Sequence, residues 1–435
     1  MSTLTKEKEV IAKDIIDPEI NVKVSKEDKE ALINSVSDKK SVEYLVNQYY
    51  QAQSFRITAE NQIRALLQQN SENDILPITE KIKTNARKQE ELIKKYMNIV
   101  TDAIPVCRWI KSITGIGPVI SAYLYSKFDV TVAQYSTNFL SYAGLNDNNN
   151  PWLGKEKAKA IVKKALTYRD EKFKELANFL KNEIGEESYD ELVKTIKTFK
   201  LKNNDIEFDD IRKKILKSAN IDIEKINGLD VSMFFDYVKN ILNPNICDDI
   251  LIKYVALETT RNPNNISKSI KSSLAKKKTK SKVPTVADLE SYLAKPPYNT
   301  DLKKMMYIIG DMFIKNSGRE KSLYGKIYKD KKLEYSIANE NGAYADTAKR
   351  ILTEKNWSKD TSTYKALSEG KLSDAHITTR ARRYAVKLFI SHVFECMYYA
   401  EYKKEPPKHY VIQYMGHHDY IPPEVDYRPF IDSKE

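Results

Sequence analysis

The chain is poor in glycine and proline, with 12 and 15 of them among its 435 residues. Average usage is about 7% for glycine and about 5% for proline. Because these residues form turns and end helices, their scarcity excludes a turn-rich β-sandwich and a glycine-rich α/β nucleotide-binding fold. The shortage therefore predicts an all-α fold built from long helices.

Cysteine is also scarce, and long apolar runs are missing. The three cysteines, Cys107, Cys247 and Cys396, are scattered and give neither a disulfide framework nor a metal-binding spacing. We interpret them as free thiols of a cytoplasmic protein. No segment approaches the ~18 apolar residues of a membrane helix, and the first residues lack the apolar stretch of a signal peptide. We predict no membrane partner, no cofactor and no metal site.

Positive charge exceeds negative charge. Lys and Arg number 72 and Asp and Glu 60, which gives a net charge of +12. This excess permits a polyanionic partner without identifying one. Seven lysines and no acid occur from residue 268 to 282, among them the candidate backbone contacts Lys276, Lys277 and Lys278. The alternative interpretation of this run is a solvated basic loop.

A heptad pattern runs through residues 42–66 and again through residues 75–99. In both stretches apolar residues recur alternately three and four positions apart, and the short polar linker Gln69–Asp74 joins them. This pattern predicts an antiparallel coiled-coil hairpin, in which Arg56 would lie beside Asn85 and Ala52 beside Gln89. The alternative is that each helix pairs with a second chain.

The segment Ile113–Pro118 has the pattern of a helix-hairpin-helix: apolar, any residue, Gly, apolar, Gly, Pro, with Ala122 one turn later. Two glycines allow a tight turn that can approach another surface closely, and Pro118 suits the first turn of a helix. Backbone N–H groups at such a turn can bind a DNA phosphate. The candidate phosphate-binding residues are Lys111, Thr114, Gly115, Ile116, Gly117, Val119 and Lys127. The alternative is a plain connection between two helices.

Four motifs together resemble a known family. The hairpin motif is followed by Phe128 or Phe139 and by the run Tyr142-Ala143-Gly144-Leu145; later come Asn299–Lys304 and Ala381–Leu388. The set is similar to the C-terminal domain of the DEDD-type insertion-sequence transposases, which recombine DNA with a bridge RNA. The resemblance implies a DNA-binding scaffold, with RNA as a further partner. It also implies a homodimer through residues 42–99, because members of the family assemble as multimers.

The chain departs from this family at its catalytic parts. Only about 40 polar residues precede the hairpin, where the family has a RuvC-like domain with four metal-binding acids. The family's nucleophilic serine has no counterpart either, because Asn146–Gly154 contains no Ser, Thr or Tyr. Strand transfer needs a nucleophile, so we predict that this activity is lost and assign no catalytic residue.

These observations divide the chain into five segments. We expect a polar arm at 1–40, a coiled-coil hairpin at 41–103, a transposase-like helical DNA-binding domain at 104–165 and 298–404, a helical insertion at 166–297 and a surface tail at 405–435. The basic residues Arg380, Arg382 and Arg383, on the helix predicted from 375 to 402, are further candidate DNA contacts.

A second interpretation is an active recombinase. Gln413–Asp419 with Tyr427 is similar to the histidine motif and nucleophilic tyrosine of tyrosine recombinases, although the spacing is ten residues instead of nine and Pro422-Pro423 would break the helix expected there. The nucleophile would be Tyr427 or a serine such as Ser141. A third interpretation is a protein-interaction scaffold. The leading hypothesis remains a DNA-binding protein of a phage or mobile element, binding duplex or branched DNA.

Overall fold

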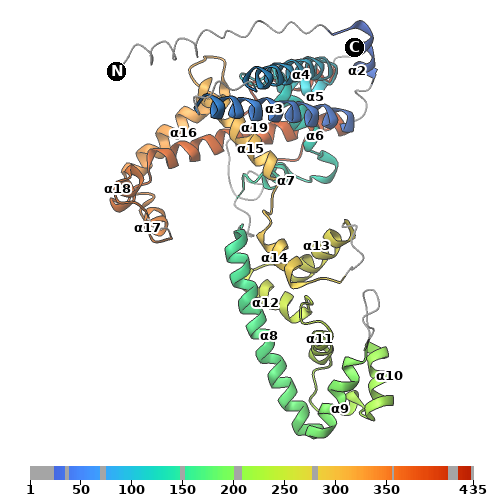
Figure 1. Cartoon of the computed structure of the whole chain (residues 1–435). Helices are drawn as coiled ribbons and strands as arrows, with labels where there is room; N and C mark the ends of the chain where they lie inside the picture. The colour runs from blue at the N-terminus through green and yellow to red at the C-terminus, as the bar shows by residue number, and fades with distance from the viewer. Residues whose placement is uncertain are drawn as a thin grey trace. The chain divides into compact units, whose positions relative to one another are not determined.

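The computed structural model confirms the all-α prediction (Figure 1). It describes residues 24–34, 39–68, 75–146, 152–199, 208–276, 283–354, 357–409 and 420–432, and these ranges contain helices and no β-strand. The chain forms two compact units, one made of residues 1–146 and 300–435 and the other of residues 147–299. None of the described helices is long and apolar enough to cross a membrane.

The first unit contains both ends of the chain. Its helices are α2 (Lys26–Asn34), α3 (Lys39–Gln68), α4 (Leu76–Ala103), α5 (Pro105–Ser112), α6 (Pro118–Lys127), α7 (Ser136–Tyr142), α15 (Thr300–Lys315), α16 (Leu323–Glu340), α17 (Ala345–Glu354), α18 (Ser362–Ser368), α19 (Asp374–Tyr402) and α21 (Arg428–Asp432), with a 3-10 turn η2 at Val130–Val132.

Helix α19 is the centre of this unit. It packs against α16, which runs alongside it in Figure 1, and against α15, α7 and α5. Phe389 on α19 contacts the rings of Phe313 and Tyr324, and Phe394 contacts Phe139. These large buried side chains join segments that precede and follow the second unit in the sequence into one core.

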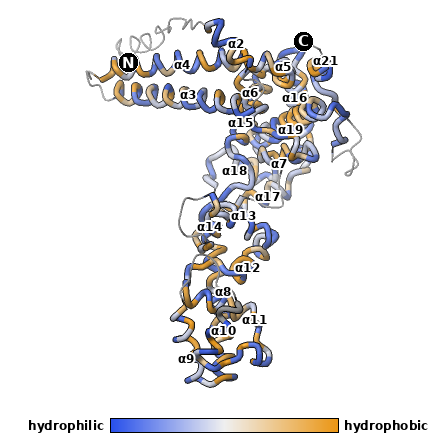
Figure 2. The backbone as a smooth tube through the Cα atoms, turned by 90° about the vertical axis from the view of Figure 1, so that its right-hand side faces the viewer, coloured by the Kyte–Doolittle hydropathy of each residue, from blue (hydrophilic) through white to orange (hydrophobic). Residues whose placement is uncertain are grey.

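Helices α3 and α4 run side by side (Figure 2), as the heptad pattern predicts. The buried face of α4 differs from the predicted one: Ala86 and Glu90 are buried, whereas Asn85 and Gln89 are exposed. Arg56 accordingly pairs with Glu90 at 2.6 Å. Gln53 of α3 donates to the same carboxylate at 3.1 Å, so polar contacts across the hairpin bury a face of α4 that the apolar spacing does not report. Knobs-into-holes packing of a coiled coil stays a prediction.

The second unit is smaller and also helical. It contains α8 (Gly154–Ile184), α9 (Glu186–Lys197), α10 (Phe208–Ala219), α11 (Val231–Leu242), α12 (Asp249–Thr259), α13 (Pro263–Lys276) and α14 (Val286–Ala294), with a 3-10 turn η3 at Ile223–Lys225. Two apolar clusters share α8: its first half packs with α12–α14 and its second half with α9–α11.

The insertion begins earlier than expected. The predicted boundary at 165/166 falls inside α8, which is one continuous helix of 31 residues and lies wholly in the second unit. Its Arg169 is buried and donates to the Asp248 carboxylate at 3.1 Å and to the backbone oxygens of Ile246 and Pro244. Because both halves of α8 pack only with clusters of the second unit, the helix belongs to that unit and the border lies before it.

Most described residues of the tail are exposed or partly exposed, as its expected surface position requires, but Tyr427 anchors the tail in the core of the first unit. Tyr427 is only 4% exposed and lies against the rings of Trp109 and Tyr399. The indole N–H of Trp109 donates to the backbone oxygen of Val425 at 2.7 Å. The contact of Tyr427 with Trp109, which is remote in the sequence, thus holds in place a tail whose composition is otherwise polar.

A buried histidine links this tail to the core. His392 on α19 is fully buried; its two ring nitrogens are hydrogen-bonded to the Tyr324 hydroxyl at 2.8 Å and to the backbone oxygen of Ile421 at 2.9 Å. Burial lowers the pKa of His392 to about 4. The neighbouring Glu395 carboxylate accepts from the Tyr420 hydroxyl and pairs with His409.

We expect this histidine to make folding sensitive to mild acid. An unfolded histidine has a pKa of about 6.5, so unfolding at lower pH takes up a proton that the folded chain excludes. The stabilisation is complete above pH 6.5 and is lost as the pH falls toward 4, by about 3 kcal/mol at most. Denaturant unfolding at pH 7, 5.5 and 4.5 should show this fall, and His392→Gln should flatten it. An equal pH dependence in both proteins would contradict the prediction.

Candidate nucleic-acid interface

The predicted hairpin is present as two helices, α5 and α6, joined by the turn 113–117. Ile113 and Ile116 are buried and anchor the turn in the core. Gly115 has a φ of +93°, which side chains other than glycine rarely adopt, whereas Gly117 is extended and precedes the first residue of α6, Pro118. The residue types therefore match the roles that the motif predicts for them.

The turn leaves several backbone donors available. Within the described part of the chain, the N–H groups of Gly115, Gly117, Val119 and Ile120 have no acceptor. Gly115 is exposed, and no atom lies within 4 Å of the place where a Cβ of Gly117 would be. Free amides at the start of a helix carry a partial positive charge and suit an anion.

The lysines beside the turn are less available than predicted. Lys111 lies 2.5 Å from the Asp102 carboxylate and also donates to Asn98, and Lys127 lies 2.6 Å from Glu43. Thr114 is occupied too, because its N–H and its hydroxyl both donate to Glu424. Because these acids partly neutralise the lysines, the free backbone amides are the groups at the turn best able to donate hydrogen bonds to an anion.

Two further cations come from a loop that sequence reasoning missed. The loop between α15 and α16, residues 316–322, lies against the turn: a Cβ on Gly115 would be 2.6 Å from the side-chain nitrogen of Asn316. Arg319 and Lys321 in this loop are exposed, as is the acid Glu320 between them, and none of the three forms an ion pair within the described residues. Their separation of about 200 residues from the turn left no sequence signal.

The arginines of α19 have different surroundings from one another. Arg382 lies over the ring of Tyr307 at 3.9 Å, and its stem crosses Gly310 so closely that a Cβ there would be 2.4 Å from it. Arg380 lies over the rings of Tyr335 and Tyr344. Of these side chains Arg380 and Tyr307 are exposed and Arg382 is partly buried, and arginine and tyrosine at a surface can stack on bases or contact phosphate. Arg383 instead donates to the backbone oxygen of Leu145 at 2.8 Å.

The Tyr142–Leu145 motif ends a helix. Gly144 adopts a φ of +67°. The N–H of Leu145 donates to the backbone oxygen of Leu140 at 2.9 Å, which is the 6→1 hydrogen bond of a Schellman cap. Leu145 is buried, and Phe128 and Phe139 stack on each other at 4.2 Å nearby in the core. These residues therefore support the hairpin from the inside.

The candidate nucleophiles lie in the protein interior or in partly buried positions. Tyr427 is buried, and burial raises its pKa well above the usual value for a tyrosine. Ser141 is partly buried within α7. A phenol that is covered and hard to ionise is poorly suited to attack DNA.

A serine–histidine–glutamate chain occurs in the same unit. The Ser136 hydroxyl is 3.0 Å from one ring nitrogen of His409, whose other nitrogen is 2.5 Å from Glu395. This order of groups is typical of an activated serine. Ser136 is only 3% exposed, however, so a substrate cannot reach its hydroxyl. These hydrogen bonds instead connect α7 and α19 with His409, which follows α19.

The remaining candidates are dispersed. Lys276 is exposed at the end of α13 in the second unit, whereas Lys277 and Lys278 lie outside the described residues, as do His417, His418 and Asp419. In the ranges that the structure describes, no three His, Cys, Asp or Glu side chains come close enough together to hold a metal ion.

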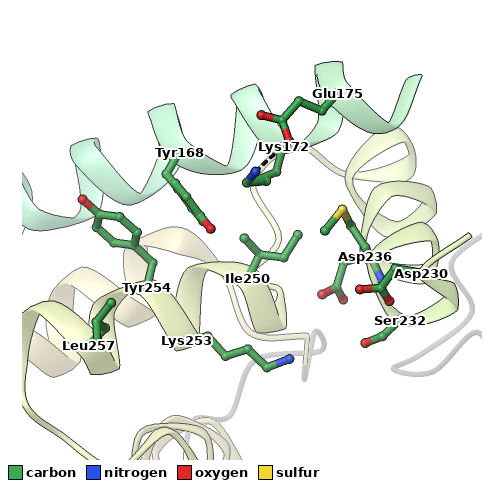
Figure 3. Close-up of a pocket in the computed structure, with 11 residues that line it drawn as sticks. Tyr168, Lys172, Glu175, Asp230, Ser232, Asp236, Ile250, Lys253, Tyr254 and Leu257 are labelled. Carbon is green, nitrogen blue, oxygen red and sulfur yellow. Dashed lines mark hydrogen bonds and ion pairs between the residues drawn. The ribbon is translucent and has the colours of Figure 1, made fainter. Parts of the chain in front are cut away.

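The second unit has a pocket of about 450 Å³ between α8, α11 and α12 (Figure 3). Tyr168 and Tyr254 form an aromatic wall, with ring centroids 5.1 Å apart. The buried Asp236 faces the interior of the pocket, and burial raises its pKa to about 6. Asp230 and Glu175 add further acid, and Lys172 pairs with Glu175. Lys172 and Lys253 offset two of these three acids, and the pocket belongs to the second unit whereas the turn 113–117 belongs to the first, so the pocket is not part of the DNA-binding candidate.

We expect the two glycines of the turn to respond differently to alanine. Gly115→Ala should reduce the free energy of unfolding by about 1–3 kcal/mol, because of its positive φ and the close Asn316 side chain. Gly117→Ala, with an extended backbone and empty space around it, should change the stability by less than about 1 kcal/mol. Urea unfolding of both variants measures this difference, and equal losses would contradict it.

The chain was also compared with protein-family models, with curated proteins and with solved structures, and none of them matches it.

Proposed function

We propose that this chain is a DNA-binding protein of a phage or mobile element, derived from an insertion-sequence transposase, which binds the DNA backbone through the turn 113–117 and does not cleave strands. One observation carries the proposal: the free amides of Gly115 and Gly117 lie beside a loop with two unpaired cations, Arg319 and Lys321. The buried thiols of all three cysteines fit a reducing compartment, the cytoplasm.

Amides and cations of this kind recognise phosphate, which all DNA sequences share. Contacts to phosphate position a protein on the backbone and carry no sequence information. We therefore expect weak dependence on sequence and strong dependence on salt. The exposed ring of Tyr307, with the partly buried Arg382 over it, could extend the contact to unpaired bases in branched DNA.

Loss of strand transfer follows from the lack of a suitable nucleophile. Asn146–Gly154, which follows the Gly-Leu motif, contains no hydroxyl side chain, and Tyr427 is buried. No covalent intermediate with DNA can form without such a group. Incubation with DNA should accordingly leave no covalent adduct on a denaturing gel; an adduct that disappears in Tyr427→Phe would favour the recombinase instead.

DNA binding is tested by gel shifts over a range of salt concentrations. The double variant Arg319→Ala/Lys321→Ala should weaken binding at least about tenfold and reduce the slope of log K against log salt by about 2, since each lost phosphate contact accounts for roughly 0.9. Gly117→Val should weaken binding to all sequences alike. Lys349→Ala/Lys365→Ala, on α17 and α18, is the charge-matched control.

The substrates for this test are linear duplex DNA, a four-way junction and duplex RNA. Tighter binding to RNA would make RNA the partner. No binding of the wild type to any of them at low salt, where phosphate contacts are strongest, would favour the protein-interaction scaffold.

We also propose that two copies associate through α3 and α4. These helices expose large apolar side chains, each more than half exposed: Phe55 in the middle of α3, Leu67 at its end, and Ile75, Ile78 and Ile82 before and within the start of α4. Ile75, Ile78 and Ile82 are spaced three and four positions apart, so they share one face of the chain entering and forming α4. A patch of this kind is typical of a protein–protein interface.

Sedimentation equilibrium tests the association. The wild type should be a dimer, and Ile78→Glu/Ile82→Glu should be a monomer because it places two charges in the apolar contact. Lys88→Glu, which changes the net charge by the same amount on the same helix, should remain a dimer. A monomeric wild type, or a dimer that survives the double substitution, would rule this association out.

A further inference from the structure

An acidic side chain already occupies part of the hairpin turn. One carboxylate oxygen of Glu424 accepts from the Thr114 N–H at 2.9 Å and from the Thr114 hydroxyl at 2.8 Å. The other oxygen accepts from the N–H of Leu323, the first residue of α16, at 2.8 Å. The turn and the start of α16 thus bind the same anion from two sides, which supports the ability of this place to hold a negative group.

The position of Glu424 is fixed by its neighbours in the sequence. The next residue, Val425, accepts from Trp109 through its backbone oxygen, and Tyr427 is buried in the core. The backbone at Glu424 therefore cannot move away without unpacking the core. Only its side chain is able to rotate, so the negative charge stays close to the turn.

The occupied and the free donors are neighbours in the chain. Glu424 binds the amide of Thr114, and the next amide, that of Gly115, is free. A DNA phosphate at Gly115 and Gly117 would thus lie close to a carboxylate of the same sign. Two like charges a few ångströms apart at a protein surface repel by an amount that corresponds to roughly a tenfold change in affinity.

We propose that Glu424 competes with the DNA phosphate at the turn 113–117 and so limits the affinity of the protein for DNA. This inference rests on the proposed function of the turn. The carboxylate satisfies the Thr114 and Leu323 donors while DNA is absent, and a phosphate must either displace it or bind beside it. Glu424 acts on affinity only and takes part in no reaction.

The test is a gel shift with linear duplex DNA at low salt, comparing the wild type with Glu424→Gln. Glutamine keeps one oxygen acceptor and nearly the same shape but removes the charge, so the dissociation constant should fall about five- to tenfold. The gain should shrink as salt is added, because salt screens the repulsion. Asp426→Asn, which removes an exposed charge two residues away, is the matched control and should change the affinity less than twofold.

The outcomes separate this inference from the proposed function. If neither wild type nor Glu424→Gln binds DNA, the proposed function fails. If both bind equally, or if Glu424→Gln binds more weakly than Asp426→Asn, the turn binds DNA but Glu424 does not compete, and the inference is overturned. A melting curve checks that each variant is folded; Glu424→Met, which removes the charge and keeps the side-chain length, replaces the glutamine variant if that one is unfolded.

Discussion

The burial of α19 is the constraint on which the first unit depends. Thirteen of the 29 residues of this helix are buried. The helices that cover it precede the second unit in the sequence (α5 and α7) or follow it (α15 and α16). Apolar surface removed from water is the main stabilising contribution to such a core. The hairpin, the α15–α16 loop and the residues after α19 are brought together because each of them packs on this one helix or on its neighbours.

That arrangement decides which charges are available at the turn. Lys111 and Lys127, close to the turn in sequence, are paired with acids from α4 and α3, whereas Arg319 and Lys321 form no ion pair within the described residues and belong to a loop that reaches the turn at Asn316. Glu424 adds a negative charge from a third segment. The electrostatic field at the turn therefore depends on how these segments pack, and counting the basic residues around the motif does not predict it.

The same principle explains which parts of the fold could be predicted. The turn Ile113–Pro118 between two helices was predictable because its glycines, proline and anchoring isoleucines act locally. The buried face of α4 was not, since Glu90 is buried through its bonds to Gln53 and Arg56 on α3, and apolar spacing does not report such a polar contact. The start of the second unit was missed because the border was placed at 165/166, inside α8, whereas the units divide at 146/147, before this helix begins.

The sequence by itself determined the helical class and the hairpin motif. Scarce glycine and proline leave long helices, and the Gly115–Gly117 spacing specifies a tight turn, both through interactions within a few residues. Only the tertiary structure decided which donors of that turn are free, which lysines are neutralised and which acid lies beside them. The lysine partners lie 9 and 84 residues away, and the Glu424 contact spans 310 residues; side-chain contacts of this kind are fixed by how the helices pack together.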